Sequence, residues 1–340
     1  MEKPAFVSLQ VLNSCNLHCI QCDYHLEKKA PDQLSTLEQL DIIKQIATWS
    51  SDIRLKFTGG EPFLDKNRLF RLLDSAHNYN LVTFILTNGT LINEEDIEHL
   101  FDSELGCISV SLDSHIPELH DNMRGSSDCF ERVSRFLHQF CLRRKQRNAS
   151  TKLWASTILT NNNLNNIDEL IFKYEDLGFD AIKFQPLFPN YRRRYSSDWK
   201  HKSSLFPTEY EIKHGFERIL YLKETHPILN QSDDYILKMQ EYFLMGEINP
   251  CIRCNIMNQV KIVDYAGNVR FCFNQDPNEG LCTVMPSCDM NIKQYDLKTL
   301  WNTTYTFRQE MQFKCHYSCG LLWDTVRNIE RKKDDQRTSS

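Results

Sequence analysis

The stretch Asn13-Ser14-Cys15-Asn16-Leu17-His18-Cys19-Ile20-Gln21-Cys22 holds three cysteines within eight residues. Three residues separate the first two cysteines, and two separate the last two. Residues 5–12, just before them, form a β-branched and apolar run that is typical of a buried strand. A loop at the end of a strand can direct three thiolates to one point, and thiolates favour soft metal centres such as iron–sulfur clusters. A 4Fe–4S cube takes four ligands, so three cysteines would leave one iron open for chemistry.

Strand and helix patterns alternate after this loop. Ser35 and Glu38 form a capping box that predicts a helix start, with Leu37 on the expected apolar stripe of that helix. The alternation predicts a parallel α/β sheet with right-handed crossovers. Periodicity alone permits either a barrel or a doubly wound open sheet. The predicted strands span 5–12, 53–58, 81–86, 108–112, 153–159 and 181–184, with a helix that starts at the capping box and further helices near 66–78, 93–101, 129–144 and 167–177.

Composition narrows the class of protein. With 340 residues, 41% apolar and 25% charged, the chain has the make-up of an ordinary globular protein. The formal net charge of −5 argues against nucleic acid as the main partner. No apolar run reaches membrane-spanning length, so we expect no membrane contact and a cytoplasmic location. Thirteen cysteines in such a chain indicate metal binding rather than disulfides.

Polar and glycine-rich motifs stand where predicted strands end. Gly59-Gly60-Glu61-Pro62 follows the second strand, and its glycines allow a close backbone approach to a ligand. The glutamate can accept hydrogen bonds from an ammonium group. On its own, such a motif is more often a turn than a site. Because a parallel barrel builds its site at the carboxyl ends of its strands, these motifs would lie together.

The cysteine spacing and Gly59-Gly60-Glu61-Pro62 together resemble the radical S-adenosylmethionine (radical SAM) superfamily. The resemblance implies a partial (β/α)6 TIM-like barrel and a 4Fe–4S cluster held by Cys15, Cys19 and Cys22. It further implies that the open iron is chelated by the amino and carboxylate groups of S-adenosylmethionine. Three packing cysteines, or a zinc site completed by His18 or His25, are the alternatives for this loop.

The same resemblance extends to cofactor contacts on later strands. Gly59, Gly60, Glu61 and Pro62 would bind the methionine amino group. Ser111 would contact the ribose or carboxylate, and Arg124 would pair with the carboxylate through its two-pronged donor geometry. Further candidate contacts are Thr87 and Asn88 in the nucleoside pocket and Leu187 on the adenine. The alternatives are a surface ion pair of Arg124 with Asp121 and a core position for Leu187.

Seven of the thirteen cysteines lie after residue 250 and form a second constellation. Short strands at 260–263 and 269–273, a turn with Gly267 and a helix at 297–312 resemble the SPASM/twitch accessory domain of radical SAM enzymes. The resemblance implies one auxiliary 4Fe–4S cluster. Cys251 is a candidate hydrogen-atom donor to the substrate. Cys251, Cys282 or Cys288 could also replace one of the cluster ligands. The alternative to a cluster is a zinc knuckle formed by Cys251, Cys254, Cys315 and Cys319. The expected auxiliary ligands are Cys254, Cys272, Cys315 and Cys319.

These patterns divide the chain into four parts. We expect a radical SAM partial barrel at 1–190, a helical connecting region at 191–249, an auxiliary cluster domain at 250–325 and a disordered tail at 326–340.

The predicted activity is that of a radical SAM enzyme. A flavodoxin- or ferredoxin-type donor would reduce the first cluster, which would cleave S-adenosylmethionine to methionine and a 5′-deoxyadenosyl radical. Abstraction of a substrate hydrogen would lead to oxidation (dehydrogenation) or epimerisation of a small molecule such as a sugar or aminocyclitol. Only fourteen residues precede Cys15, which favours a small molecule over a peptide. The alternatives are a peptide-modifying maturase (epimerisation or crosslinking) and a non-catalytic zinc-binding interaction protein.

Overall fold

One sheet organises the chain, and the order of its strands is β6-β5-β4-β3-β2-β1-β7-β8. The computed structural model describes residues 3–22, 32–188, 203–245, 256–271 and 290–314. Neighbouring strands from β1 to β6 are parallel. The strands are β1 (Phe6–Gln10), β2 (Arg54–Thr58), β3 (Thr83–Thr87), β4 (Cys107–Ser111), β5 (Lys152–Leu159), β6 (Ala181–Pro186), β7 (Val260–Val263) and β8 (Val269–Arg270).

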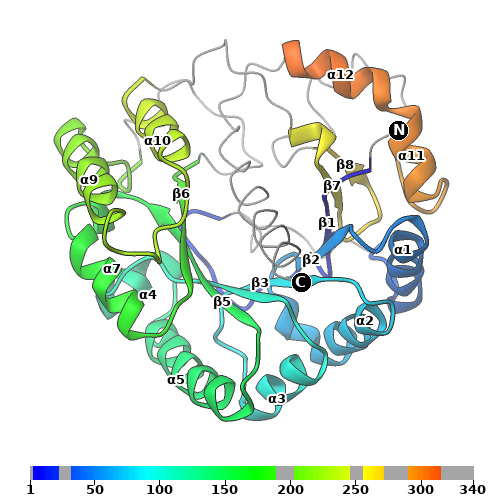
Figure 1. Cartoon of the computed structure of the whole chain (residues 1–340), viewed down its shortest axis with the longest axis horizontal. Coiled ribbons are helices and arrows are strands. Elements are labelled where there is room, and N and C mark those ends of the chain that lie inside the picture. The colour runs from blue at the N-terminus through cyan, green and yellow to red at the C-terminus, as the bar shows by residue number, and fades with distance from the viewer. Residues whose placement is uncertain (1–2, 23–31, 189–202, 246–255, 272–289, 315–340) are drawn as a thin grey trace, which may run out of the picture.

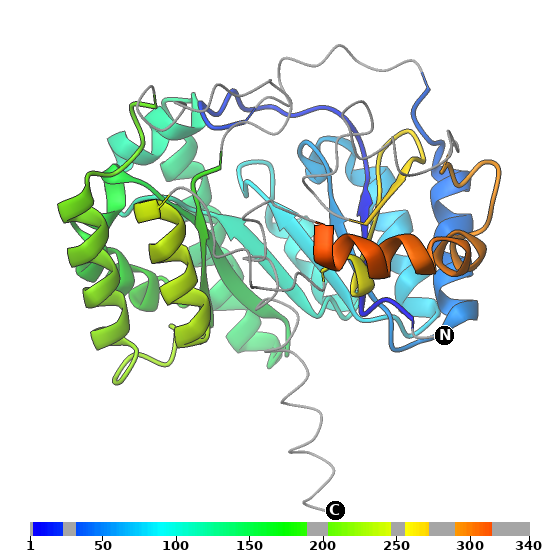
Figure 2. The ribbon, with the colours of Figure 1, turned by 90° about the horizontal axis from the view of Figure 1, so that it is seen from above.

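Helices cover the outer side of the curved sheet, as Figure 1 shows. This arrangement confirms the partial barrel. Figure 2 shows α9 and α10 on one side of the molecule and α11 and α12 on the other. The helices are α1 (Thr36–Trp49), α2 (Lys66–Asn78), α3 (Glu94–Asp102), α4 (Pro117–Arg124), α5 (Cys129–Arg147), α6 (Asn161–Leu164), α7 (Ile167–Asp176), α9 (Glu209–Leu222), α10 (Asp233–Met245), α11 (Leu297–Thr303) and α12 (Tyr305–Lys314), with 3-10 turns η2 (Pro62–Asp65) and η3 (Ile256–Asn258).

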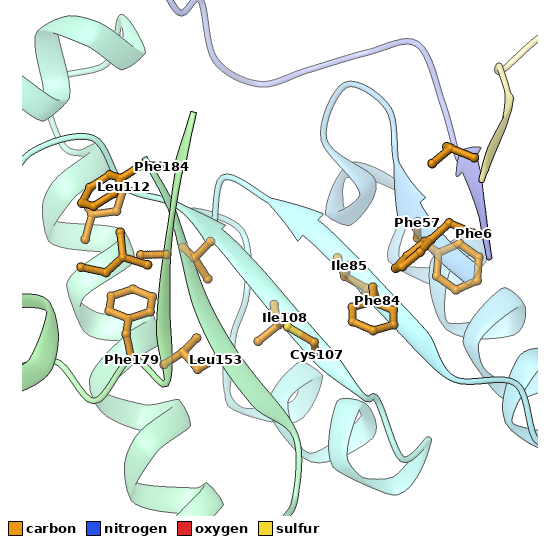
Figure 3. Close-up of a cluster of buried hydrophobic side chains, with 14 of the residues drawn as sticks. Phe6, Phe57, Phe84, Ile85, Cys107, Ile108, Leu112, Leu153, Phe179 and Phe184 are labelled. Atoms are coloured by element: carbon orange, nitrogen blue, oxygen red, sulfur yellow. The ribbon is translucent and has the colours of Figure 1, made fainter. Parts of the chain in front are cut away.

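Side chains alternate between the two faces of each strand. On β2, Leu55 and Phe57 are fully buried toward the helices, whereas Lys56 between them faces the interior side. Figure 3 shows part of the buried apolar cluster, including Phe57 and Phe84. The interior side is therefore where polar side chains can line a site.

The first helix begins as predicted, but one residue of its expected apolar stripe is exposed. The Ser35–Glu38 capping box is present at the start of α1. Leu37 is 71% exposed, so its place on the apolar stripe was wrong. Gln39 is buried instead, because its amide donates to the Val11 carbonyl at 2.9 Å and satisfies the end of the strand before the cysteine loop.

The C-terminal hairpin continues the main sheet. β7 pairs in parallel with β1, with Phe6 opposite Val260, and β8 returns antiparallel to β7. The single helix expected at 297–312 is two helices, α11 and α12. The break falls at Thr304, whose hydroxyl donates to the Leu300 carbonyl at 2.6 Å and caps α11. No helix in the described ranges is both long and apolar enough to cross a bilayer.

Candidate active site

The cysteine loop and the glycine motif are joined by backbone hydrogen bonds. The Gly60 amide donates to the Leu12 carbonyl at 3.0 Å, and the Glu61 amide donates to the Ser14 carbonyl at 2.8 Å. A Cβ on Gly60 would lie 1.9 Å from the Ser14 oxygen, and Gly59 has a left-handed φ of +136°. Glycine is needed at both positions because the two loops touch backbone to backbone.

Glu61 is the buried centre of this junction, with 1% of its surface exposed. One carboxylate oxygen accepts from the Thr87 hydroxyl at 2.7 Å and from the Phe63 amide at 3.1 Å. The other accepts from the Asn88 amide at 2.7 Å. Burial raises the pKa of Glu61 to about 7, although these donors oppose the shift. Thr87 therefore holds Glu61 in place rather than pointing at a free space.

Asn88 connects the end of β3 to the cysteine loop. Its side-chain amide donates to Asn16 Oδ1 at 2.9 Å and lies 4.0 Å from Cys15 Sγ. Thr90 completes the network, because its hydroxyl accepts from Asn16 Nδ2 at 2.9 Å and donates to Asn88 Oδ1 at 2.7 Å. The third strand thus fixes the position of the first cysteine. The sequence pattern had placed only Thr87 and Asn88 here.

Arg124 lies at the other side of the cysteine loop, 7% exposed at the end of α4. Its Nη2 pairs with Asp113 Oδ2 at 2.5 Å, and its Nη1 lies 4.0 Å from Cys19 Sγ. Burial opposes the charge, but the Asp113 carboxylate raises the pKa of Arg124 above its ordinary value. The alternative partner Asp121 was wrong, since its carboxylate accepts from the Phe130 amide instead.

The cysteine loop also docks on the turn that ends α4. The Ile20 amide donates to the Met123 carbonyl at 3.0 Å. Gly125 has a left-handed φ of +64°, and a Cβ there would lie 2.5 Å from the His18 carbonyl oxygen. α4 was missed in the sequence, although Pro117 at its first turn and Gly125 after its end are ordinary start and stop signals.

Behind Arg124, His120 is buried and neutral. Its Nδ1 accepts from the Asp113 amide at 3.2 Å, so the ring proton lies on Nε2, which is 3.4 Å from Cys129 Sγ. Burial lowers the pKa of His120 to about 2, and the Arg124 charge contributes. This imidazole positions Asp113 and is not a source of protons at neutral pH.

The remaining two predicted contact residues, Ser111 and Leu187, lie in different surroundings. Ser111 ends β4 opposite Ser156, is partly exposed on the interior side, and its hydroxyl has no hydrogen-bond partner among the described residues. Leu187 follows β6, is 3% exposed and packs in the core, with its carbonyl accepting from the Tyr242 hydroxyl at 3.2 Å. Ser111 is thus available to a ligand, while Leu187 sits in the apolar core.

None of the three thiols of the loop is in a disulfide; Cys19 is buried and the other two are partly buried. Burial raises the pKa of Cys15 to about 11, and the charges of Glu61, Cys19 and Cys22 add to this rise. Within the described ranges, no three His, Cys, Asp or Glu side chains are arranged to hold a metal ion. A 4Fe–4S cube binds each cysteine at a different iron, so its ligands need not converge on one point as they would around a single ion.

The chemistry of the site fits a cluster and its cofactor. Three thiols supply soft donors for a 4Fe–4S cube. Buried Arg124 Nε, Gln21 Oε1 and the Asn13 side-chain amide have no hydrogen-bond partner in the described part of the chain. Such orphaned groups are costly unless a ligand satisfies them. Cys15, Cys19 and Cys22 would hold the cluster, and Arg124, whose Nη1 lies 4.0 Å from Cys19 Sγ, is next to one of these ligands.

The auxiliary site falls outside the described residues. Cys251, Cys254, Cys272, Cys282, Cys288, Cys315 and Cys319 all lie there, as does His25. The hairpin β7–β8 that leads toward them is present, and Gly267 takes the left-handed φ of +89° at its turn. The auxiliary cluster, the alternative zinc knuckle and the hydrogen-donor role of Cys251 stay predictions.

Comparison with known proteins supports the same assignment. The family described as the radical SAM superfamily matches residues 9–143. The AdoMet-dependent heme synthase of Methanosarcina barkeri is 24% identical, covering 92% of this chain and 87% of the relative. Among solved structures, anSMEcpe with bound AdoMet has a TM-score of 0.68 at 19% identity, covering 92% of this chain and 84% of its own. Streptococcus suis SuiB bound to precursor peptide SuiA has a TM-score of 0.64 at 16% identity, covering 88% and 64%. Residues 9–143 therefore match the radical SAM superfamily, whose cofactors are S-adenosylmethionine and a 4Fe–4S cluster.

Proposed function

We propose that the protein cleaves S-adenosylmethionine reductively and uses the radical to remove hydrogen from a small organic substrate. The observation that carries the proposal is the buried junction of the cysteine loop with Gly60 and Glu61. When bound, the cluster and S-adenosylmethionine supply the 5′-deoxyadenosyl radical that abstracts the hydrogen atom. Oxidation is the expected outcome, with epimerisation as its rival.

The chain's own residues bind and orient the reactants. Glu61 and the backbone of Gly60 would accept from the methionine amino group, because they lie beside Cys15 at the ends of β1 and β2. Asp113 holds Arg124 Nη2, and Arg124 Nε has no partner among the described residues, so its N–H could donate to the methionine carboxylate. Ser111 would contribute its hydroxyl on the fourth strand. Fixed donors of this kind need no reorganisation when the reaction occurs.

The substrate and partners are further parts of the proposal. We favour a small molecule, since the heme synthase of Methanosarcina barkeri aligns with nearly the whole chain. SuiB was solved with a precursor peptide, but its low identity makes it a guide to the fold alone. We also infer a flavodoxin- or ferredoxin-type electron donor and an auxiliary cluster held by the C-terminal cysteines.

Anaerobic reconstitution tests these proposals directly. Two clusters predict about eight irons per chain, one predicts about four, and a zinc protein contains none. Addition of dithionite and S-adenosylmethionine should give 5′-deoxyadenosine and methionine. The Cys15→Ala, Cys19→Ala and Cys22→Ala variants should lose this product, whereas Cys141→Ala, at a half-buried thiol remote from the loop, should keep it. If the wild type takes up no iron on reconstitution and makes no 5′-deoxyadenosine, the proposed function is refuted.

A further inference from the structure

The interior face of β1 and β2 carries a group of unsatisfied polar side chains. Ser8 lies opposite Lys56 in the parallel register, and Gln10 lies opposite Thr58. Ser8 is 2% exposed, yet its hydroxyl has no hydrogen-bond partner among the described residues. The side-chain oxygen of Gln10 is also buried without a partner there. A buried polar group without a partner is unusual in a native protein and calls for an explanation.

Lys56 adds a positive charge to this face. It keeps some accessible surface although it lies deep among other residues, as expected of a side chain that lines the interior of the barrel. Burial lowers the pKa of Lys56, and the described residues supply no hydrogen bond or ion pair to its ammonium group. A buried lysine without a counter-ion destabilises the fold, so a role in binding accounts for its presence.

Other buried cations in the described part of the chain are compensated. Lys183 donates to Asn230 Oδ1 at 2.6 Å. Lys261 donates to the Leu297 carbonyl, and Arg124 is paired with Asp113. The fold therefore satisfies buried charges elsewhere, which makes the uncompensated group on β1 and β2 a specific feature rather than a general looseness.

Lys56, Ser8 and Gln10 lie earlier along the strands than the cofactor site, in surroundings suited to an organic anion. Lys56 is three residues before Gly59, or about 10 Å along the strand. Its register neighbour on the other side is Phe84, whose ring lies 5.2 Å from Phe6 and 6.1 Å from Trp154. Figure 3 shows Phe6 and Phe84 side by side. An aromatic wall beside a cation and two polar groups can hold an apolar body that carries a negative charge.

We propose that Lys56, Ser8 and Gln10 bind an anionic group, a carboxylate or a phosphate, of the substrate. The ammonium of Lys56 pairs with the anion, and the Ser8 hydroxyl donates to it. The Gln10 oxygen accepts from a hydroxyl or amino group next to the anion. This inference rests on the proposed function and names the substrate class, because a substrate anchored here presents its body toward the cofactor at the strand ends.

Calorimetric titration of the anaerobically reconstituted enzyme tests the site with two probes, inorganic phosphate and succinate. We expect the wild type to bind one of them, and Lys56→Gln to weaken that binding at least tenfold. Lys56→Arg, which keeps the charge, should weaken it less. The exposed lysine of α1 provides the matched control, and Lys44→Gln should bind like the wild type. The probe that binds identifies the anionic group as a phosphate or a carboxylate.

Two results would overturn the inference: neither probe binds the wild type, or Lys56→Gln and Lys44→Gln bind equally well. The formation of 5′-deoxyadenosine by the wild type and by Lys44→Gln is measured on the same preparations. If that product forms but no anion binds, only the inference about Lys56 fails. If anions bind but the product is absent, the proposed function fails instead.

Discussion

A methyl group on Gly60 should break the junction between the cysteine loop and the glycine motif. The added Cβ would lie 1.9 Å from the Ser14 oxygen and 2.4 Å from its carbonyl carbon. This is about 1.5 Å closer than ordinary van der Waals contact allows. Since both atoms belong to backbone, no side chain can rotate away, and the two loops must separate in Gly60→Ala.

The cost follows from the bonds that separation would break. The amides of Gly60 and Glu61 donate across this junction to Leu12 and Ser14. Each broken bond that leaves a buried group unsatisfied costs about 1–3 kcal/mol. We therefore expect Gly60→Ala to lose about 3–5 kcal/mol of unfolding free energy, measured by urea denaturation. Displacement of Ser14 also moves Cys15, so iron retained after reconstitution should fall by at least half.

Gly106→Ala is the matched control. The nearest atom to its added Cβ, the Thr83 carbonyl oxygen, lies at 3.0 Å and far from the cysteine loop in the sheet register. A shift of a few tenths of an ångström relieves that contact, so this variant should lose about 1 kcal/mol or less and keep its iron. If Gly60→Ala matches Gly106→Ala in stability and in iron content, then the backbone junction does not position the cysteine loop.

Three further predictions concern buried charges. Asp113→Asn leaves the Arg124 cation buried without its counter-ion and should cost about 3–5 kcal/mol in urea denaturation. The control Asp128→Asn, at an exposed ion pair, should leave stability nearly unchanged, and equal losses in the two variants would contradict the buried pair. The pKa of Glu61 is raised to about 7 in the folded chain, so as the pH rises this carboxyl loses its proton in the unfolded chain before it does so in the folded chain. The free energy of unfolding should therefore fall by about 3 kcal/mol as the pH rises from the ordinary glutamate pKa to about 7. Urea denaturation of metal-free protein across this range should show that slope, and Glu61→Gln should lack it; parallel slopes would refute the shift. Lys56→Met removes a buried ammonium group whose pKa is lowered by burial, so this variant should have a melting temperature a few degrees higher at neutral pH, or about 1 kcal/mol more stability. This gain should disappear as the pH approaches the ordinary lysine pKa. A lower melting temperature for the variant would show that Lys56 has a structural partner.

Local signals in the sequence predicted most of the elements. The capping box at Ser35 starts α1, and Gly178, with φ of +81°, follows the end of α7 as expected of a helix stop. The alternation of apolar runs located the six strands from β1 to β6. These features depend on residues close together in the chain, so a pattern of neighbours is enough to predict them.

Pairings between distant residues were not predictable in this way. An ion pair of Arg124 with Asp121, three positions away, was the alternative to its cofactor role, and its partner is instead Asp113, two residues after the end of β4. The chain also gave no sign that β7 would join β1 across about 250 residues, or that Gln39 would replace Leu37 in the core. Each depends on how a helix or strand is rotated against another, which local periodicity leaves open.

By itself, the sequence determined the chemistry that this protein can carry. The spacing of Cys15, Cys19 and Cys22 and the glycine motif predicted the family whose model matches residues 9–143. Only the tertiary structure decided which polar groups are satisfied. Lys56 reads as an ordinary strand lysine in the sequence, and its isolation appears once β1 and β3 flank it, since burial and pairing are properties of the packed sheet.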